Sequence, residues 1–208
     1  MIDCGPESLK LSLMRATILR DDLVNLDALI LREDFEEFRH NPEPSPNSLP
    51  EALQLRDLVD GATSRALRKP DYQRETSCWP YRKIAEYVRS FVEGELLPAV
   101  ILWRSPGTGN IFVIDGSHRL SALIAFVRDD YGDNATSQAY FRNRLQWEHL
   151  QAAQKARKLI EEIMGSYEML QSAARDPGNS DPVHVTRARN VETLRIPVLW
   201  VPNTARLR

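Results

Sequence analysis

Apolar residues between positions 81 and 93 recur at the spacing of an α-helix. Ile84, Val88 and Phe91 fall on one face, while charged side chains occupy the other faces. This pattern predicts an amphipathic helix that packs one side on a core. Gly94 follows the last apolar position and is a plausible end for the helix.

Two short apolar runs follow this helix and differ from it in pattern. Residues 97–103 and 111–114 are rich in branched and aromatic side chains, and a turn-forming segment, 105–110, separates them. Such runs predict two buried strands joined as a hairpin. Directly after the second run, Leu120, Leu123, Ile124 and Val127 return to helical spacing, so we expect a helix to begin near residue 117.

The longest periodic segment covers residues 138–174. Its apolar stripe continues for many turns with charged residues beside it, which predicts one long amphipathic helix inserted before the last strand. Residues 193–201 form a final apolar run and predict that strand. Pro197 within it indicates a sheet edge or a break, because proline cannot donate a ladder hydrogen bond.

The first eighty residues carry weaker signals. We expect a short strand at 26–31, an extended connector at 41–50, where four of ten residues are proline, and a helix at 51–59 that begins with a capping box. Gly61 is a plausible end for that helix. Residues 62–79 show no period and are predicted to be irregular.

Composition narrows the class of protein. The 208 residues are 42% hydrophobic and carry a formal net charge of -2, which argues against a protein that coats nucleic acid electrostatically. No apolar run is long enough to span a bilayer, and two cysteines make no disulfide framework. We therefore expect one soluble, cytoplasmic domain over 1–208, with an α/β (α+β) core at 70–128 plus 193–201 and the helical insertion at 138–174.

The junction at residues 115–119 combines most of the candidate chemistry. A buried strand ends at Asp115, Gly116 allows a sharp turn, and a helix begins within a residue or two. The first amides of a helix lack intrahelical partners and carry the positive end of its dipole. The junction is therefore a candidate anion site, especially for a phosphate.

Four side chains at this junction have predicted roles. Arg119 can clamp a phosphate with its permanent charge, and Ser117 can cap the helix or donate to a phosphate oxygen. His118 can donate a hydrogen bond or titrate near neutral pH, while Asp115 can accept from a sugar or hold Mg²⁺ through water. Ordinary helix capping explains the same residues about equally well.

Other candidates are weaker. Gln73 and Arg74 can reach the same phosphates if the chain folds back, although a solvated loop explains them better. Cys78 is read as a core residue, and the acids at 129, 130 and 133 as a polar helix end. The four histidines are too widely spaced for a zinc site, and the basic run at 155–158 is expected to pair mostly with acids of its own helix.

The segment from Asp115 to Ala122 resembles the signature of the ParB/sulfiredoxin superfamily. Gly116, Arg119 and Ala122 fit the ParB pattern of glycine, arginine and alanine at three-residue steps, and the DGQHR group matches with Ser117 in place of glutamine. The run from Tyr72 through Trp79 to Pro98 is similar to the GmrSD-type N-terminal domain. The resemblance covers about 70–128 well and 193–201 loosely.

This resemblance implies a small mixed sheet with flanking helices that binds a nucleoside triphosphate at the turn, CTP in ParB and ATP in sulfiredoxin. The implied contacts are Gly116, Ser117, His118, Arg119, Gln73 and Arg74, with Asp115, His118 and Arg119 catalytic and Asp115 a candidate ligand of Mg²⁺. Ser117 replaces the nucleophilic cysteine of sulfiredoxin and the glutamate of many ParB proteins. Peroxiredoxin repair is therefore not expected, and metal ligation is in doubt.

Two functions remain open. The first is a nucleotide-binding protein, with hydrolysis and weak nuclease activity by analogy only, that acts in plasmid maintenance or phage defence. The second is a non-catalytic regulatory module that binds an anion or a DNA phosphate at the same turn, with the 138–174 helix as a surface for a protein partner or a second copy. Sequence-specific DNA binding is a third, weaker option.

Overall fold

The computed structural model describes residues 22–35 and 49–202, and most of the expected connector at 41–50 lies outside these ranges. Within them the chain forms a six-stranded sheet, a two-stranded pairing and several helices. The predicted class, a mixed α/β fold with a small mixed sheet and flanking helices, is confirmed.

The six-stranded sheet has the order β2-β4-β7-β6-β8-β3. A hairpin of β6 and β7 lies at its centre, β4 pairs in parallel with β7, and β8 pairs in parallel with β6. The outer strands are short: β2 pairs in parallel with β4, and β3 pairs antiparallel with β8. The strands are β2 (Leu31–Glu33), β3 (Ala52–Gln54), β4 (Leu67–Pro70), β6 (Val100–Arg104), β7 (Ile111–Asp115) and β8 (Arg195–Trp200), and the separate pair is β1 (Leu23–Val24) with β5 (Trp79–Pro80).

The central hairpin is buried on both faces. Leu102 lies opposite Val113, and both side chains belong to the main core cluster. The next pair, Trp103 opposite Phe112, points to the other face, where Phe35 contacts both rings at centroid distances of 5.0 and 5.2 Å. Burial on two faces explains why these strands read as continuous apolar runs rather than alternating ones.

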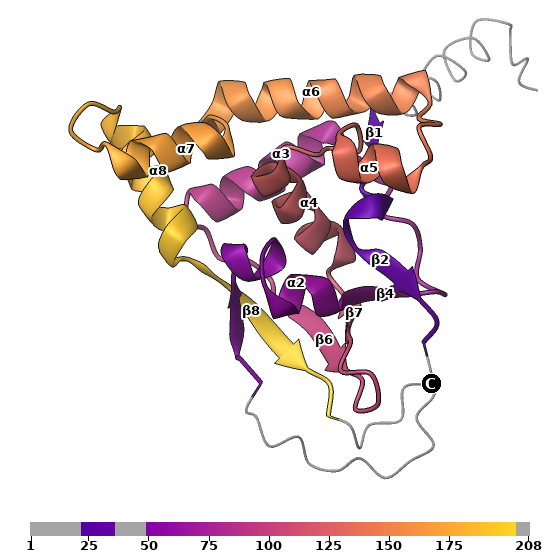
Figure 1. Cartoon of the computed structure of the whole chain (residues 1–208). Helices are drawn as coiled ribbons and strands as arrows, with labels where there is room; N and C mark the ends of the chain where they lie inside the picture. The colour runs from indigo at the N-terminus through magenta and orange to yellow at the C-terminus, as the bar shows by residue number, and fades with distance from the viewer. Residues whose placement is uncertain (1–21, 36–48, 203–208) are drawn as a thin grey trace, which may run out of the picture.

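The helices gather mainly on one side of the sheet, where α3 and α4 lie between the strands and α6 (Figure 1). Within the described residues, none of the helices is both long and apolar enough to cross a membrane. The helices are α2 (Ala62–Ala66), α3 (Tyr81–Val92), α4 (Ser117–Arg128), α5 (Ala135–Tyr140), α6 (Trp147–Met164), α7 (Tyr167–Arg175) and α8 (Pro182–Thr193), with two 3-10 turns, η1 (Asp27–Leu29) and η2 (Leu55–Leu58).

Four predicted elements, two helices and two strand regions, form as the apolar pattern indicated. Helix α3, the β6–β7 hairpin, helix α4 and the last strand β8 all occur at or close to the expected positions. Pro197, however, does not mark an edge, because β8 lies between β6 and β3 and Pro197 is opposite Ala52. The short strand β3 occupies the edge instead.

The prediction of one helix over 138–174 is wrong. The segment contains the end of α5, all of α6 and most of α7. The break between α6 and α7 occurs at Gly165, whose φ of 87° is not helical, and at Ser166, whose side chain accepts a hydrogen bond from the Met169 amide as an N-cap. The apolar stripe continues across the point where one helix ends and the next begins, so the stripe alone did not reveal the break.

The first eighty residues also differ from expectation. Residues 26–31 contain η1 and only the first residue of strand β2, and 51–59 contain β3 and η2 rather than a helix. Residues 62–79, predicted to be irregular, contain α2 and the sheet strand β4, and Gly61 begins α2 instead of ending a helix. The sheet thus extends beyond the predicted core at 70–128 and 193–201. Helix α8 also forms, where no helix was expected.

Candidate functional site

The junction between β7 and α4 requires glycine. Gly116 has a φ of 101°, and a Cβ there would lie 2.7 Å from Val100 Cγ1 and 3.2 Å from Arg119 Nη2. Helix α4 begins directly after it, and no side chain of the described residues caps this helix start. The predicted strand–glycine–helix turn is therefore present, with its first amides uncapped by side chains, although Gly116 and Ser117 are themselves buried.

Arg119 is held by its own chain. Its Nη1 donates to the carbonyl oxygens of Pro98 at 2.8 Å and Ala99 at 2.9 Å, and its Nη2 donates to the Asp115 carboxylate. The Arg119 side chain is 13% exposed, whereas that of Asp115 is 62% exposed. The guanidinium thus joins the start of α4 to the segment that precedes β6, and Asp115 is the partner that faces solvent.

His118, in the first turn of α4, contacts a separate segment. Its ring stacks on Trp79 with centroids 5.3 Å apart, and its Nε2 lies 3.0 Å from the sulfur of Cys78. The ammonium of Lys83 lies 4.5 Å from the Trp79 ring centroid. Cys78 is exposed, so its reading as a core residue is wrong. Residues 78–83 and 115–119 therefore form one surface, called the junction surface below.

The environment of His118 favours its neutral form. Burial lowers the pKa of the imidazole, and the nearby positive charges of Lys69 and Lys83 lower it further, while Asp27 opposes them. A neutral imidazole has one nitrogen that donates and one that accepts a hydrogen bond. His118 can therefore accept a hydrogen bond from the Cys78 thiol or donate one to a bound anion.

Gln73 reaches the junction, although a solvated loop was the favoured interpretation of its segment. Its Nε2 donates to the carbonyl oxygens of Val113 and Ile114, at the end of β7, at 3.1 Å each. Its Oε1 is buried and has no hydrogen-bond partner in the described structure. Arg74, in contrast, is exposed and has no hydrogen bond or ion pair among the described residues.

Tyr87 on α3 is a residue near the junction that the sequence pattern did not single out. Its hydroxyl is buried without a partner among the described residues, and burial raises its pKa to about 12, although the charge of Arg119 opposes this. Its ring also contacts that of Trp79 at a centroid distance of 5.8 Å. The sequence indicates Tyr87 only through its spacing of four residues from Lys83, which places both on the same face of the helix.

A buried ionic cluster lies beside this region. The Lys69 ammonium, fully buried, donates to Asp27 Oδ1 at 2.6 Å and to Thr76 Oγ1 at 3.1 Å. Arg32 donates to the same carboxylate at 3.2 Å. Burial alone raises the pKa of Asp27, but the hydrogen bonds from Arg32 and Lys69 outweigh it and hold the pKa below its usual value. Sequence reasoning missed this cluster, because its members are far apart in the chain.

The acidic residues after α4 have structural partners. Asp129 and Asp133 both accept hydrogen bonds from Arg157 on α6, and Asp130 accepts from the Ser137 amide and hydroxyl in α5. The expected pairing of the basic run within its own helix is thus mostly wrong, although Lys158 does lie 3.8 Å from Glu162. Over residues 22–35 and 49–202, no three His, Cys, Asp or Glu side chains are grouped as metal ligands, and Asp115 has no such neighbours.

A family model for the GmrSD restriction endonuclease, N-terminal domain, matches residues 55–196, which is more than half of the chain. The chain belongs to this family. No curated protein and no solved structure matches it. The GmrSD N-terminal domain match confirms that part of the predicted resemblance and places the chain among DNA-associated restriction modules of phage defence. The matched residues contain the whole junction surface but not Asp27 of the buried cluster.

Proposed function

We propose that this GmrSD-type domain binds a nucleoside triphosphate, ATP or CTP, at the junction surface. The observation that carries the proposal is the uncapped start of α4, placed after a glycine that tolerates no side chain, with His118 and Lys83 beside it. Uncapped helix amides, an ammonium and an imidazole donor together suit a polyanion. The predicted likeness to the ParB/sulfiredoxin fold supports the same ligand class.

The exposed part of the junction surface is where the phosphates would bind. Lys83 is exposed and His118 is half-buried, so both can reach a ligand from solvent, whereas Ser117 is only 5% exposed. Trp79 offers an aromatic ring beside this ammonium and imidazole against which a base or sugar can pack. The unpaired Gln73 Oε1 would accept a hydrogen bond from the ligand or from its water.

Arg119 contributes first as a positioning residue in this proposal. Its hydrogen bonds to Pro98 and Ala99 fix the turn, and its charge lies close to the α4 amides. A direct contact with phosphate requires the guanidinium to exchange its Asp115 partner. Asp115, once released, is an exposed carboxylate that can accept from a ribose hydroxyl or hold Mg²⁺ bound to the phosphates.

Hydrolysis, if the domain performs it, would use the same residues. His118 would orient the attacking water, and the Arg119 charge would stabilise the negative charge that develops on the phosphate oxygens. In a DNA restriction module, nucleotide binding or turnover would control the action on DNA. Arg74 is exposed close in sequence to Gln73 and remains a further candidate phosphate contact.

Thermal unfolding of the full chain with each nucleotide tests the proposal. A ligand that binds only the folded state must raise the melting temperature. We expect ATP or CTP, with Mg²⁺, to raise it in the wild type and to have much less effect on Lys83→Ala and His118→Ala. Arg89→Ala is the matched control, because it removes an exposed charge of the same helix outside the junction surface. No shift with any of ATP, CTP, GTP or UTP would contradict the proposal.

The second candidate function is a non-catalytic module that uses the same surface to bind an anion or a DNA phosphate. The engagement of Arg119 with main-chain carbonyls favours it, because that guanidinium then supports the fold rather than a reacting group. Measured turnover of the bound nucleotide, lost in His118→Ala, supports the enzyme. Binding without turnover supports the module.

A further inference from the structure

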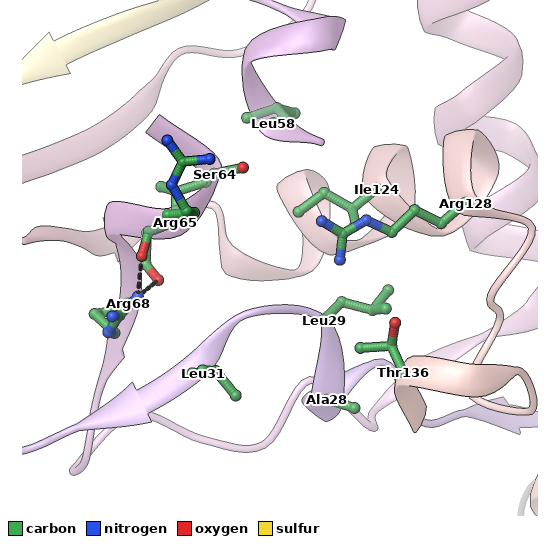
Figure 2. A pocket seen from close by; sticks show the side chains of 11 residues that line it. Ala28, Leu29, Leu31, Leu58, Ser64, Arg65, Arg68, Ile124, Arg128 and Thr136 are labelled. Atoms are coloured by element: carbon green, nitrogen blue, oxygen red, sulfur yellow. Dashed lines mark hydrogen bonds between the residues drawn. The ribbon is translucent and has the colours of Figure 1, made fainter. Parts of the chain in front are cut away.

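A separate pocket of about 430 Å³ opens between η1, η2, α2 and the C-terminal half of α4 (Figure 2). Its floor is apolar, and all four floor side chains are at most 7% exposed: Leu29, Leu58, Leu67 and Ile124. None of the residues of the junction surface lines it. The volume lies within the range of small-molecule sites, which typically combine apolar walls with a few polar groups.

Two guanidinium groups at this pocket lack a balancing acid. Among residues 22–35 and 49–202, neither Arg65 nor Arg128 has an ion-pair partner, although Arg128 Nη2 donates to the Val59 carbonyl at 3.1 Å. A third arginine of the wall, Arg68, is already paired with Glu33 at 2.6 Å. Figure 2 shows the Arg128 side chain extending from α4 across the pocket toward the side where α2 carries Arg65.

The surrounding acids do not neutralise these two charges. No lining residue is acidic. Asp129, next to Arg128, pairs with Arg157, and among the described residues neither Asp57 nor Asp60 forms an ion pair with Arg65 or Arg128. The pocket therefore presents two positive charges that have no ion-pair partner among the described residues, above an apolar floor, which is an arrangement that selects an anion carrying an apolar group.

We infer that this pocket binds a nucleoside monophosphate, that is, a phosphate monoester with a flat base. A monoester carries close to two negative charges at neutral pH, which matches Arg65 and Arg128, and guanidinium groups bind phosphate oxygens in a bidentate manner. The base packs on the leucine and isoleucine floor. The hydroxyls of Ser64 and Thr136, both in the lining, provide hydrogen bonds to the sugar or phosphate.

This site is independent of the proposed triphosphate site, yet α4 connects the two. His118 lies in the first turn of α4, whereas Ile124 and Arg128 lie in its last two turns. A monophosphate held at the C-terminal half of this helix is thus well placed to influence the junction surface. The binding test does not require such coupling.

The test is calorimetric titration of the full chain with AMP, with adenosine and inorganic phosphate as the two partial ligands. We expect AMP to bind with a dissociation constant below about 1 mM, and each partial ligand to bind at least about tenfold more weakly. Arg65→Gln and Arg128→Gln should each weaken AMP binding by about tenfold or more. Arg56→Gln, which removes an exposed charge from η2 outside the lining, should not.

Two further variants keep the result interpretable. Thr136→Trp fills the pocket from an exposed position and leaves both arginines in place, so it should also abolish AMP binding. Lys83→Ala should leave AMP binding intact, which separates this site from the junction surface. The inference fails if AMP does not bind, if inorganic phosphate binds equally well, or if only Lys83→Ala removes binding.

Discussion

At the scale of single residues, glycine is required at position 116 because neighbouring atoms leave no room for a Cβ, in addition to its positive φ. We expect Gly116→Ala to lower the free energy of unfolding by about 3 kcal/mol or more, because strain in φ adds to the overlap with Val100. Gly109→Ala is the matched control. Its φ of 74° is also positive, but a Cβ at this position would meet no atom within 4 Å, so strain alone should cost about 1 kcal/mol. Urea denaturation measures both, and equal losses would contradict the steric argument.

The buried pair of Asp27 and Lys69 should respond unequally to loss of either partner. Asp27→Asn leaves a fully buried ammonium without a carboxylate, which costs about 3–5 kcal/mol. Lys69→Met costs less, because Arg32 continues to neutralise Asp27. Chemical denaturation of both variants checks the order. A larger loss for Lys69→Met would show that Arg32 does not compensate.

His118 should make stability depend on pH. Burial and the charges of Lys69 and Lys83 lower its folded pKa, so the unfolded chain takes up the proton first as pH falls. The stabilising contribution is therefore complete above the unfolded pKa of about 6.5 and is lost as pH falls through the lower folded value. Unfolding at pH 7.5, 6.5 and 5.5 should show a smaller acid loss in His118→Asn than in the wild type. Parallel losses would contradict the assignment.

At the scale of elements, Arg157 connects α6 to the segment between α4 and α5. It forms a two-pronged pair with Asp133 at 2.8 and 2.9 Å and also contacts Asp129 at 2.7 Å. We expect Arg157→Ala to destabilise the protein by about 1–3 kcal/mol. Lys158→Ala, which removes a 79% exposed side chain, should change stability by less than about 0.5 kcal/mol. Thermal unfolding compares the two, and similar effects would mean that the Arg157 pairs contribute little.

The elements that sequence predicts well are those whose burial follows from a local pattern of apolar residues, either helical spacing or a short continuous run. Helices α3 and α4 and the β6–β7 hairpin are of this kind. Strands β3 and β4 are only three and four residues long, and they exist because β8 and β7 pair with them across the sheet. The end of α6 was detectable, since Gly165 and Ser166 form a stop and a cap, but the uninterrupted apolar stripe outweighed that signal.

In the candidate site, too, features encoded in one short segment were easier to predict than contacts between distant segments. The turn at 115–119 was predictable from the strand–glycine–helix order, whereas the approach of Gln73 was indicated only by the family resemblance and not by the pattern of its own segment. The carbonyl partners of Arg119 and the contact of His118 with Cys78 were not, because they depend on how the segment before β6 and the residues before α3 fold back onto α4. A main-chain carbonyl can be supplied by any residue type, so such contacts cannot be predicted from the amino-acid sequence of the partner segment.

At the scale of the whole molecule, the matched family segment does not contain a complete sheet. It begins at residue 55, after β2 and β3, and ends at 196, two residues into β8. We expect a fragment of residues 55–196 to be unfolded, because β6 would lose its parallel neighbour and the core would lose Leu29, Ile30 and Leu53. Circular dichroism and amide NMR dispersion, against the full chain as control, measure this. A folded fragment would show that the outer strands are dispensable.

The position of β8 also bears on how the protein forms during translation. Strand β3, at residues 52–54, pairs with β8, whose partners at 195–197 emerge from the ribosome about 140 residues later. The edge of β6 that pairs with β8 must wait about 98 residues for this neighbour. Until then the nascent chain carries a central strand with one unpaired edge, so slow elongation or premature termination would leave an aggregation-prone intermediate that depends on chaperones.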